Sequence, residues 1–316
     1  MDGLVILDKP AGKTSHDVVA EVKRILKADK AGHTGTLDPL ATGVLPVLIN
    51  EGTKLSPFLV NDTKEYRATI LLGVRTDTLD ITGEVLERTD PDVRRDAVVR
   101  AVEGLLGTRR QVPPLYSAVK VHGRPLHRWA RKGIQLMPEP RTVEVLRIGV
   151  DEVDLPRVAF SVSCSKGTYI RSLCEDIGDI LGCGATLTAL RRTRSGSFSE
   201  EAALLLDGLT DGEKKTRLSE SLIPPAEAIS GVKAVYVDAS LAEKIRNGHQ
   251  LTGSEMRGDH IPFLVQGDMI KLINLETGLV AVAETLCCTE EMIPDSGTMP
   301  VARTLRVFKS QKMNQP

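Results

Sequence analysis

The stretch GHTGTLDPLATGVLPV, residues 32–47, joins a glycine-containing loop directly to an apolar segment. Gly35 and Gly43 allow sharp backbone turns, and Pro39 restricts the backbone immediately after Asp38. Such a loop can hold one carboxylate at a fixed point on a rim, where functional loops generally lie. Asp38 could act there as a nucleophile or general base, or it could only cap a turn, because Asp before Pro is a common turn former. The loop alone leaves both alternatives open.

The segments around this loop predict strands and helices without the regular alternation of a doubly wound fold. Residues 3–7 predict a buried strand, and Ser15 is predicted to cap a helix that runs to about Lys27. The other predictions are a loop over 29–43, helices near 53–60, 92–106, 125–132 and 167–182, and strands over 44–50, 65–73, 141–150, 157–164 and 186–198. The pattern favours the α+β class, with a mixed, mainly antiparallel sheet and flanking helices.

A change of character near LIPPAEAISGVKAV, residues 222–235, indicates a domain boundary. Short strands separated by turns are predicted beyond it, near 233–237, 262–266, 269–274, 278–285 and 301–308. We therefore predict a large domain over residues 1–230 and a small β-rich domain over residues 231–316.

Composition limits the class of protein. The chain has 316 residues, of which 41% are hydrophobic and 26% charged, and no apolar run approaches the roughly 20 residues that span a bilayer. Its five cysteines lack CxxC spacing, which is typical of reduced thiols in a soluble cytoplasmic protein. We find no GxSxG, Walker A or HExxH motif and no metal-ligand spacing among the histidines. The sequence therefore predicts neither a cofactor nor a metal.

Positive charge is concentrated in one segment, although the net charge of the chain is only −1. Residues 109–147 contain nine Lys or Arg residues against Glu139 and Glu144, and five prolines divide the segment into short pieces. This excess of basic residues suits a phosphate-facing surface, with a solvated basic face that binds nothing as the alternative. The candidate phosphate contacts in this segment include Arg124, Arg128 and Arg131.

Six blocks, in order along the chain, resemble the motifs of the bacterial tRNA pseudouridine-55 synthase family. The blocks are GLVILDKPAGKTSHDVV, GHTGTLDPLATGVLPV, KEYRATILLGVRTDTLDITG, PPLYSAVKVHGRPLHRWARKG, CSKGTYIRSLCEDIG and GCGATLTALRRTRSGSF. The resemblance implies an isomerase that converts the uridine at position 55 in the T-loop of tRNA to pseudouridine without a cofactor. It also implies an RNA-binding insertion at about 109–147 and, more weakly, a PUA-like C-terminal domain.

The resemblance implies a role for three residues in catalysis. Asp38 matches the catalytic aspartate of the family, Tyr66 the tyrosine expected to stack on the uracil and take part in proton transfer, and Arg171 the arginine paired with the aspartate. A nearby guanidinium would keep a poorly solvated carboxylate ionised and oriented. Whether Asp38 attacks the ribose, attacks carbon 6 of uracil, or assists elimination of a ribose proton is left open.

Other matches concern the pocket and the RNA. The target base is stacked inside the T-loop, so the enzyme should flip it out, and His33 matches the residue that fills the vacated space. Leu190 matches an apolar residue of the pocket floor, while Lys9 and Lys120 match basic positions near the pocket and RNA. Tyr169 could face the same pocket as Arg171 only if it lies at or before the start of a helix, because residues two apart on a helix point about 200° apart.

The sequence departs from the family in the insertion, where His127 often corresponds to a tyrosine and Trp129 is also unexpected. The resemblance implies tRNA, through its T-arm stem-loop, as the partner, with no membrane or obligate protein partner and a monomer expected. Two alternatives stay open: a tRNA-binding or tRNA-folding protein without catalysis, and a pseudouridine synthase that acts on another RNA.

Overall fold

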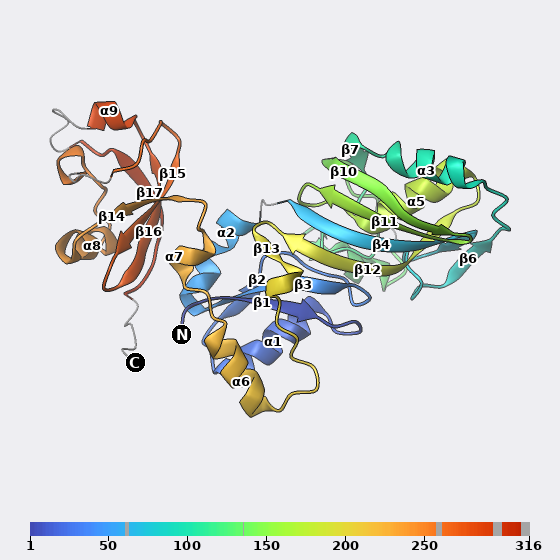
Figure 1. Ribbon diagram of the computed structural model, residues 1–316, viewed down its shortest axis with the longest axis horizontal. Coiled ribbons are helices and arrows are strands. Elements are labelled where there is room, and N and C mark those ends of the chain that lie inside the picture. The colour runs from blue at the N-terminus through green and yellow to red at the C-terminus, as the bar shows by residue number, and fades with distance from the viewer. Residues whose placement is uncertain (61–62, 135, 257–260, 293–298, 311–316) are drawn as a thin grey trace.

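The computed structural model describes residues 1–60, 63–134, 136–256, 261–292 and 299–310. Figure 1 shows an elongated molecule with a large sheet at one end and a small sheet at the other. The chain passes from the large sheet through α6 (Asp211–Glu220) and α7 (Pro225–Ala228) before it enters the small sheet.

The described residues form a nine-stranded sheet whose main path runs β1-β3-β12-β4-β11-β10-β7, with β2 paired to β3 and β13 to β12. The pairing of β12 with β3 is parallel and the others are antiparallel, so the predicted mixed, mainly antiparallel sheet is confirmed. The strands are β1 (Gly3–Lys9), β2 (Ala31–His33), β3 (Thr42–Ile49), β4 (Lys64–Leu72), β7 (Gly107–Gln111), β10 (Arg141–Asp154), β11 (Arg157–Cys164), β12 (Ala185–Ser195) and β13 (Phe198–Ser199). The predicted loop over 29–43 was wrong in part, because it contains β2.

The position of β12 between β3 and β4 brings the quoted loop beside the centre of the sheet. Arg192 of β12 is the register partner of both Gly43 on β3 and Tyr66 on β4. Gly43 has a φ of +99°, and a Cβ atom there would lie 2.2 Å from the carbonyl oxygen of Arg192. Glycine at position 43 is therefore needed for the close approach of β3 and β12.

Two helices, α3 (Arg95–Glu103) and α5 (Ile170–Leu181), pack on one face of the large sheet. Leu173 of α5 and Phe160 of β11 are both fully buried in the shared core. Helix α5 ends at Gly182, whose left-handed backbone terminates it as predicted. Both helices are shorter than predicted at their N-terminal ends.

Helix α1 (Ser15–Leu26) is capped by Thr14, and the prediction that Ser15 is the cap was wrong. The Asp17 backbone N–H donates to Thr14 Oγ1 at 3.1 Å, and the Thr14 N–H donates to the Asp17 carboxylate at 2.9 Å. This reciprocal capping box requires an acid three residues after the cap, which Ser15 lacks. Ser15 is instead buried and bonds to the loop that holds Asp38.

Shorter elements lie outside the two main sheets, and three of them, the hairpin β8–β9 and α4, lie within the insertion between β7 and β10. The elements are η1 (Asn50–Leu55), α2 (Ser56–Leu59), β5 (Val74–Thr76), β6 (Val85–Arg88), β8 (Lys120–Val121), β9 (Arg124–Pro125), α4 (Leu126–Ala130) and η2 (Glu200–Ala202).

The small C-terminal sheet has the order β14-β15-β16-β17. Its elements are β14 (Lys233–Tyr236), α8 (Ala239–Arg246), η3 (Gly253–Glu255), β15 (Met269–Asn274), β16 (Gly278–Thr285), α9 (Thr289–Met292) and β17 (Ala302–Val307). The strand predicted over 262–266 was wrong: the segment is irregular, with Phe263 exposed and Leu264 buried. Leu279 and Phe308 pack in one cluster with Leu4, so this sheet shares a core with β1.

Within the described residues, no helix combines the length and the apolar character needed to cross a membrane.

Candidate active site

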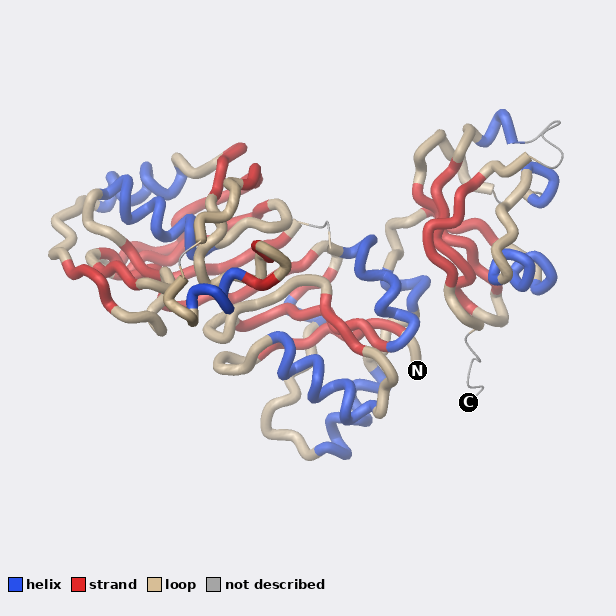
Figure 2. The backbone as a smooth tube through the Cα atoms, turned by 180° about the vertical axis from the view of Figure 1, so that it is seen from behind, coloured by secondary structure: helices blue, strands red, loops and turns tan. Residues whose placement is uncertain are grey.

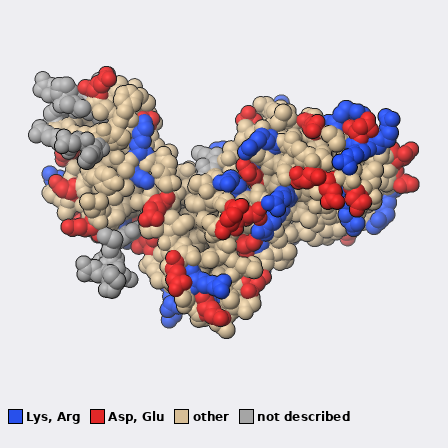
Figure 3. Space-filling model, viewed as in Figure 1, with Lys and Arg blue, Asp and Glu red and all other residues tan. Residues whose placement is uncertain are grey.

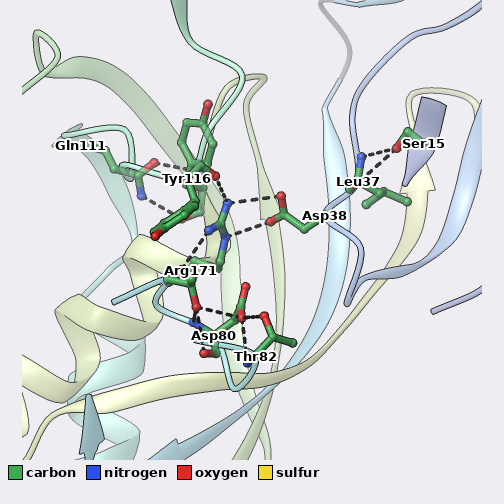
Figure 4. A network of polar contacts seen from close by, with 10 residues as sticks. Ser15, Leu37, Asp38, Asp80, Thr82, Gln111, Tyr116 and Arg171 are labelled. Carbon is green, nitrogen blue, oxygen red and sulfur yellow. Dashed lines mark hydrogen bonds and ion pairs between the residues drawn. The ribbon is translucent and has the colours of Figure 1, made fainter. Parts of the chain in front are cut away.

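Asp38 lies in the loop between β2 and β3, and the backbone on both sides of it is anchored. The Leu37 N–H donates to Ser15 Oγ at 2.8 Å, and the Ser15 hydroxyl donates to the Leu37 carbonyl at 3.1 Å. After Asp38, the Pro39 carbonyl accepts from the Gly12 N–H at 2.8 Å. The carboxylate therefore stands on a loop fixed to the start of α1 and to the turn before it (Figure 4).

Lys9, the last residue of β1, also holds this loop. Its side chain is fully buried, and its ammonium donates to the carbonyls of Pro10 at 2.7 Å, Lys13 at 2.6 Å and Pro39 at 3.3 Å. Burial lowers the pKa of Lys9 to about 8, while the nearby charge of Asp38 opposes this shift. Lys9 therefore lies near the Asp38 loop, as the predicted position near the pocket requires, and its contact with RNA stays a prediction.

Arg171, the second residue of α5, faces the Asp38 carboxylate side-on (Figure 4). Its Nη2 donates to Oδ1 at 3.2 Å, and its Nε lies 2.9 Å from Oδ2. The Nε hydrogen is not directed at Oδ2, so this second contact is an ion pair without a hydrogen bond. The side chain of Arg171 is 3% exposed and that of Asp38 is 34% exposed. The carboxylate is therefore the accessible member of the pair.

The remaining donors of Arg171 bind backbone carbonyls from two other parts of the chain. Nη1 donates to the Thr78 carbonyl at 2.9 Å, and Nη2 also donates to the Tyr116 carbonyl at 2.9 Å. The loop that carries Thr78 is held by Asp80, whose buried carboxylate accepts from the Thr82 N–H and from the hydroxyls of Thr78 and Thr82. Arg171 thus joins the Asp38 loop, the Asp80 loop and the insertion.

Burial raises the pKa of the Asp38 carboxyl above its ordinary value. The positive charge of Arg171 opposes this effect, and the negative charge of Asp80 adds to it. Arg171 therefore favours the ionised form of Asp38, as predicted from the sequence. Burial has the larger effect on the pKa of Asp38.

Tyr66 on β4 is half-buried and packs against a core cluster that includes Leu37 and Leu190. Leu190 is 7% exposed, consistent with a floor or core position. Burial raises the pKa of the Tyr66 phenol, and the positive charge of Arg192 opposes the shift. The structure thus brings Tyr66 to the same face of the sheet as the Asp38 loop.

Tyr169 immediately precedes α5 and has an extended backbone, so the condition for it to share a pocket with Arg171 is met. Its N–H donates to Gln111 Oε1 at 2.7 Å, and Gln111 Nε2 donates to its carbonyl at 3.0 Å. His33 lies on β2, and its buried Nδ1 has no hydrogen-bond partner among the described residues. Burial, followed by the charge of Arg192, lowers the pKa of His33 and favours the neutral imidazole.

The basic insertion lies in front of the sheet in the view of Figure 2, where α4 and the β8–β9 hairpin stand out from it. Lys120 is exposed, as are three arginines that we call the insertion arginines: Arg124, Arg128 and Arg131. His127 Nδ1 lies 3.0 Å from the Ser117 carbonyl, and the Trp129 indole donates to the Val121 carbonyl at 3.1 Å. The two residues that depart from the family therefore support the fold of the insertion.

A polar hollow of about 430 Å³ lies on the opposite face of the sheet. Glu65, Tyr66 and Arg67 all contribute atoms to its lining, and the side chains of Glu65 and Arg67 point away from that of Tyr66 because side chains alternate along a strand. Arg147 pairs with Glu65 at 3.0 Å, and Arg67 pairs with Glu200 at 2.9 Å. Figure 3 shows acidic and basic side chains intermixed on this face. Because its charges neutralise one another, this hollow is a poorer candidate for a phosphate-binding or catalytic site.

Sequence reasoning missed two residues of the site. Asp80 lies inside a quoted block, and its spacing of two from Thr78 and Thr82 is a signal for a carboxylate-capped turn. Arg192 lies two residues after Leu190 on the same strand, so both side chains lie on the buried face of the sheet. This spacing could have predicted that Arg192 is a buried cation. In the described part of the chain, no cluster of three or more His, Cys, Asp or Glu side chains has the arrangement of a metal site.

The comparisons with known proteins give the class of the chain, an RNA-modifying enzyme of the pseudouridine synthase class. Residues 23–170 match the model of the TruB family pseudouridylate synthase N-terminal domain, and residues 171–230 match the tRNA pseudouridylate synthase B C-terminal domain. The chain belongs to the TruB family of pseudouridylate synthases.

Similar proteins and structures agree with this assignment. The chain is 50% identical over 308 residues to a tRNA pseudouridine synthase B of Syntrophus aciditrophicus (strain SB), covering 98% of this chain and 99% of the relative. It is 43% identical over 287 residues to the enzyme of the same name from Geobacter sulfurreducens (strain ATCC 51573 / DSM 12127 / PCA), covering 90% and 94%. A Cbf5-Nop10-Gar1 complex contains a chain of similar structure, with a TM-score of 0.70, 31% identity and coverage of 98% and 85%. An H/ACA RNP bound to a substrate RNA containing 2'-deoxyuridine contains another, with a TM-score of 0.72, 30% identity and coverage of 97% and 85%.

Proposed function

We propose that the chain converts uridine 55 in the T-loop of tRNA to pseudouridine, with Asp38 as the catalytic carboxylate. The observation that carries this proposal is the ion pair between Asp38 and the buried Arg171, in a family whose relatives are tRNA pseudouridine synthases. The reaction breaks the bond between ribose carbon 1′ and uracil N1 and forms a bond from carbon 1′ to carbon 5. N1 gains a proton and carbon 5 loses one, so the overall change is an isomerisation.

We assign a distinct contribution to each of the three residues. Arg171 is inaccessible and orients Asp38, whose partly exposed oxygens are free to meet a flipped nucleotide. Tyr66 offers a phenol for stacking on the base and for proton transfer. Asp38 stabilises or traps the sugar or base while the glycosidic bond breaks, as carboxylates do in glycosidases. No step of this scheme requires a metal or another cofactor.

RNA recognition is assigned to the exposed residues of the insertion. Lys120 and the insertion arginines present positive charge that would contact phosphates of the T-arm, largely by charge and shape. His33 and Tyr169 would line the space around the flipped base. The histidine is kept neutral by its surroundings, which suits a side chain that replaces a stacked base.

The division of the chain follows from the same scheme. Residues 1–230 form the catalytic domain, and residues 231–316 form a small β-rich domain that we assign as PUA-like on its size and position. The family models end at residue 230, which supports this boundary. We propose that the protein acts as a cytoplasmic monomer on tRNA without an obligate protein partner.

Tritium release tests this proposal. A T-arm stem-loop labelled with tritium at carbon 5 of the target uridine should release label with the wild-type protein and not with Asp38→Asn, which removes the charge but keeps the shape. Binding of the same RNA should be retained by the variant. Release by Asp38→Asn at the wild-type rate would refute the role of Asp38. Binding without release by either protein would favour a tRNA-binding or tRNA-folding function.

Substrate choice is tested with the same purified chain. The similar structures come from a Cbf5-Nop10-Gar1 complex and an RNA-bound H/ACA RNP, which keeps a different RNA substrate as the second candidate. The purified chain alone should modify the tRNA stem-loop fully. Modification that appears only after a second RNA or protein is added would support the second candidate instead.

A further inference from the structure

Arg192 is a buried cation that the scheme above does not use. It lies on β12, is 1% exposed and is one of the largest fully buried side chains. Its Nε donates to the Val44 carbonyl at 2.7 Å, and its Nη2 donates to the Gly35 carbonyl at 3.1 Å. Among the residues that the structure describes, no carboxylate lies within ion-pair distance of it. The guanidinium is held by backbone dipoles alone.

Stability does not account for such a residue. Arginine stays protonated in proteins, so its burial removes the full charge from water. Among the described residues, no carboxylate lies close enough to offset this loss of hydration energy. An apolar side chain of similar volume usually fills a buried position at a smaller cost in folding free energy. A charge retained under these conditions indicates that the charge itself is used nearby.

The position of Arg192 identifies its neighbours. The Gly35 and Val44 carbonyls lie on the two sides of the loop that carries Asp38, so Arg192 binds both ends of that loop. A Cβ atom at Gly35 would lie 3.4 Å from Nη1, which shows how closely the loop covers the guanidinium. Across the sheet, Arg192 is the register partner of Tyr66.

Register partners of an antiparallel pair lie on the same face of the sheet, so the guanidinium lies beside the Tyr66 side chain. Arginine has only donors, so a hydrogen bond that forms between the two is accepted by the phenol oxygen. The phenol hydrogen is then left for another acceptor, on the side away from Arg192. A phenol that accepts from a cation is also a stronger donor, because the positive charge draws electron density from its oxygen.

We propose that Arg192 is a positioning residue for the isomerisation, which fixes both ends of the Asp38 loop and directs the Tyr66 hydroxyl toward the flipped uracil as a polarised donor. The inference rests on the proposed function. Uracil that leaves the ribose keeps the electron pair of the broken bond, and its carbonyl oxygens carry the resulting negative charge. A polarised hydroxyl aimed at one of them stabilises that charge as it develops.

The first arm of the test needs no RNA, so it is independent of the proposed function. The four tyrosines are replaced biosynthetically by 3-fluorotyrosine, which lowers the phenol pKa, and fluorine NMR follows each signal with pH. Tyr66→Phe assigns the signal of residue 66. We expect Arg192→Met to move the titration of that signal at least one pH unit higher and to leave the other three unchanged. An unchanged titration of residue 66 would overturn the proposal.

The second arm measures single-turnover tritium release in a double-mutant cycle. Arg192→Met should slow release at least tenfold while the T-arm Kd stays within about threefold. In the Tyr66→Phe background, most of that loss should disappear, because the hydroxyl through which Arg192 acts is gone. A loss that persists in full in this background would reduce Arg192 to a purely structural residue.

Arg192→Lys covers the case in which the methionine variant does not fold. It keeps the charge but cannot reach Val44, Gly35 and Tyr66 together, because a lysine lacks the planar fork. With cooperative melting retained, we expect a slower release and a shifted titration of residue 66. Wild-type values for both measurements would overturn the proposal.

Discussion

Replacement of Arg171 by methionine should move the acid limb of the isomerisation rate to higher pH. Asp38 must be ionised to act as a nucleophile or base, and it loses its charge as the pH falls through its pKa. Burial already raises that pKa, and Arg171 is the main group that opposes the rise. Without Arg171, the carboxyl therefore becomes protonated at a higher pH, and the rate falls earlier on acidification.

The size of the shift follows from the geometry of the pair. Arg171 lies 2.9 and 3.2 Å from the two Asp38 oxygens, and an opposite charge this close typically lowers a carboxyl pKa by about 1–3 units. This corresponds to roughly 1.4–4 kcal/mol, similar to the interaction of unit charges about 4 Å apart at an effective dielectric constant near 20. Because the Asp38 side chain is 34% exposed, water screens the pair, and we expect a shift of about 1–2 units.

The assay is single-turnover tritium release from about pH 5 to 9, with Arg171→Lys as the control that keeps a positive charge. The rate of Arg171→Met relative to wild type should improve as the pH rises, since more Asp38 is then ionised. Arg171→Lys should show a smaller shift of the acid limb but still lose rate, because one ammonium cannot bind Asp38, Thr78 and Tyr116 together. An acid limb at the same pH in Arg171→Met and wild type would refute the electrostatic role of Arg171.

Three other expectations can be checked directly. Gly43→Ala should lower the free energy of unfolding by on the order of 3–5 kcal/mol in a denaturant titration. Gly12→Ala is the control, because Gly12 has a similar positive φ but open space around it, and it should lower the free energy by only about 1–2 kcal/mol. Equal losses in the two variants would exclude the backbone clash at Gly43. The pKa of Lys9 in the folded protein, about 8, lies below its value in the unfolded chain, so the free energy of unfolding should rise by up to about 3 kcal/mol between pH 8 and 10.4. Lys9→Met should lose this rise. The same pH dependence in Lys9→Met and wild type would contradict the lowered pKa. Replacement of the insertion arginines by glutamate should weaken T-arm binding and reduce the slope of log Kd against log salt by about 2–3; unchanged affinity at low salt would remove this surface from the interface.

The fold could be predicted from the sequence where local signals agree with the final packing. The strand around Tyr66 and the end of α5 at Gly182 follow from apolar alternation and from a left-handed glycine. The cap of α1 was misassigned because Thr14 and Ser15 are both good caps, and only the Asp17 carboxylate distinguishes them. The strand predicted around Phe263 failed because Pro262 lacks a donor and a single buried Leu264 anchors the segment.

The pairing of Asp38 with Arg171 could be predicted only through family resemblance, since nothing local to Asp38 indicates a partner 133 residues away. The groups that hold Arg171 in place were harder still to predict. The acceptors of Arg171 at Thr78 and Tyr116 are backbone carbonyls, and no side-chain pattern marks a carbonyl that binds an arginine. The burial of Lys9 was missed for a related reason, because three carbonyls from neighbouring turns replace the carboxylate that a buried lysine usually needs.

The place of β12 in the sheet has a consequence for how the enzyme is made. Asp38 and Tyr66 are synthesised early. Strand β12 is synthesised long after both, yet it lies between β3, which follows Asp38, and β4, which carries Tyr66. Until β12 has been made, β3 and β4 have no shared neighbour. The candidate site is therefore assembled only after residue 195 has been synthesised, when a later strand inserts between two earlier ones. A nascent chain stopped before β12 would contain Asp38 and Tyr66 but would lack the strand that brings them together.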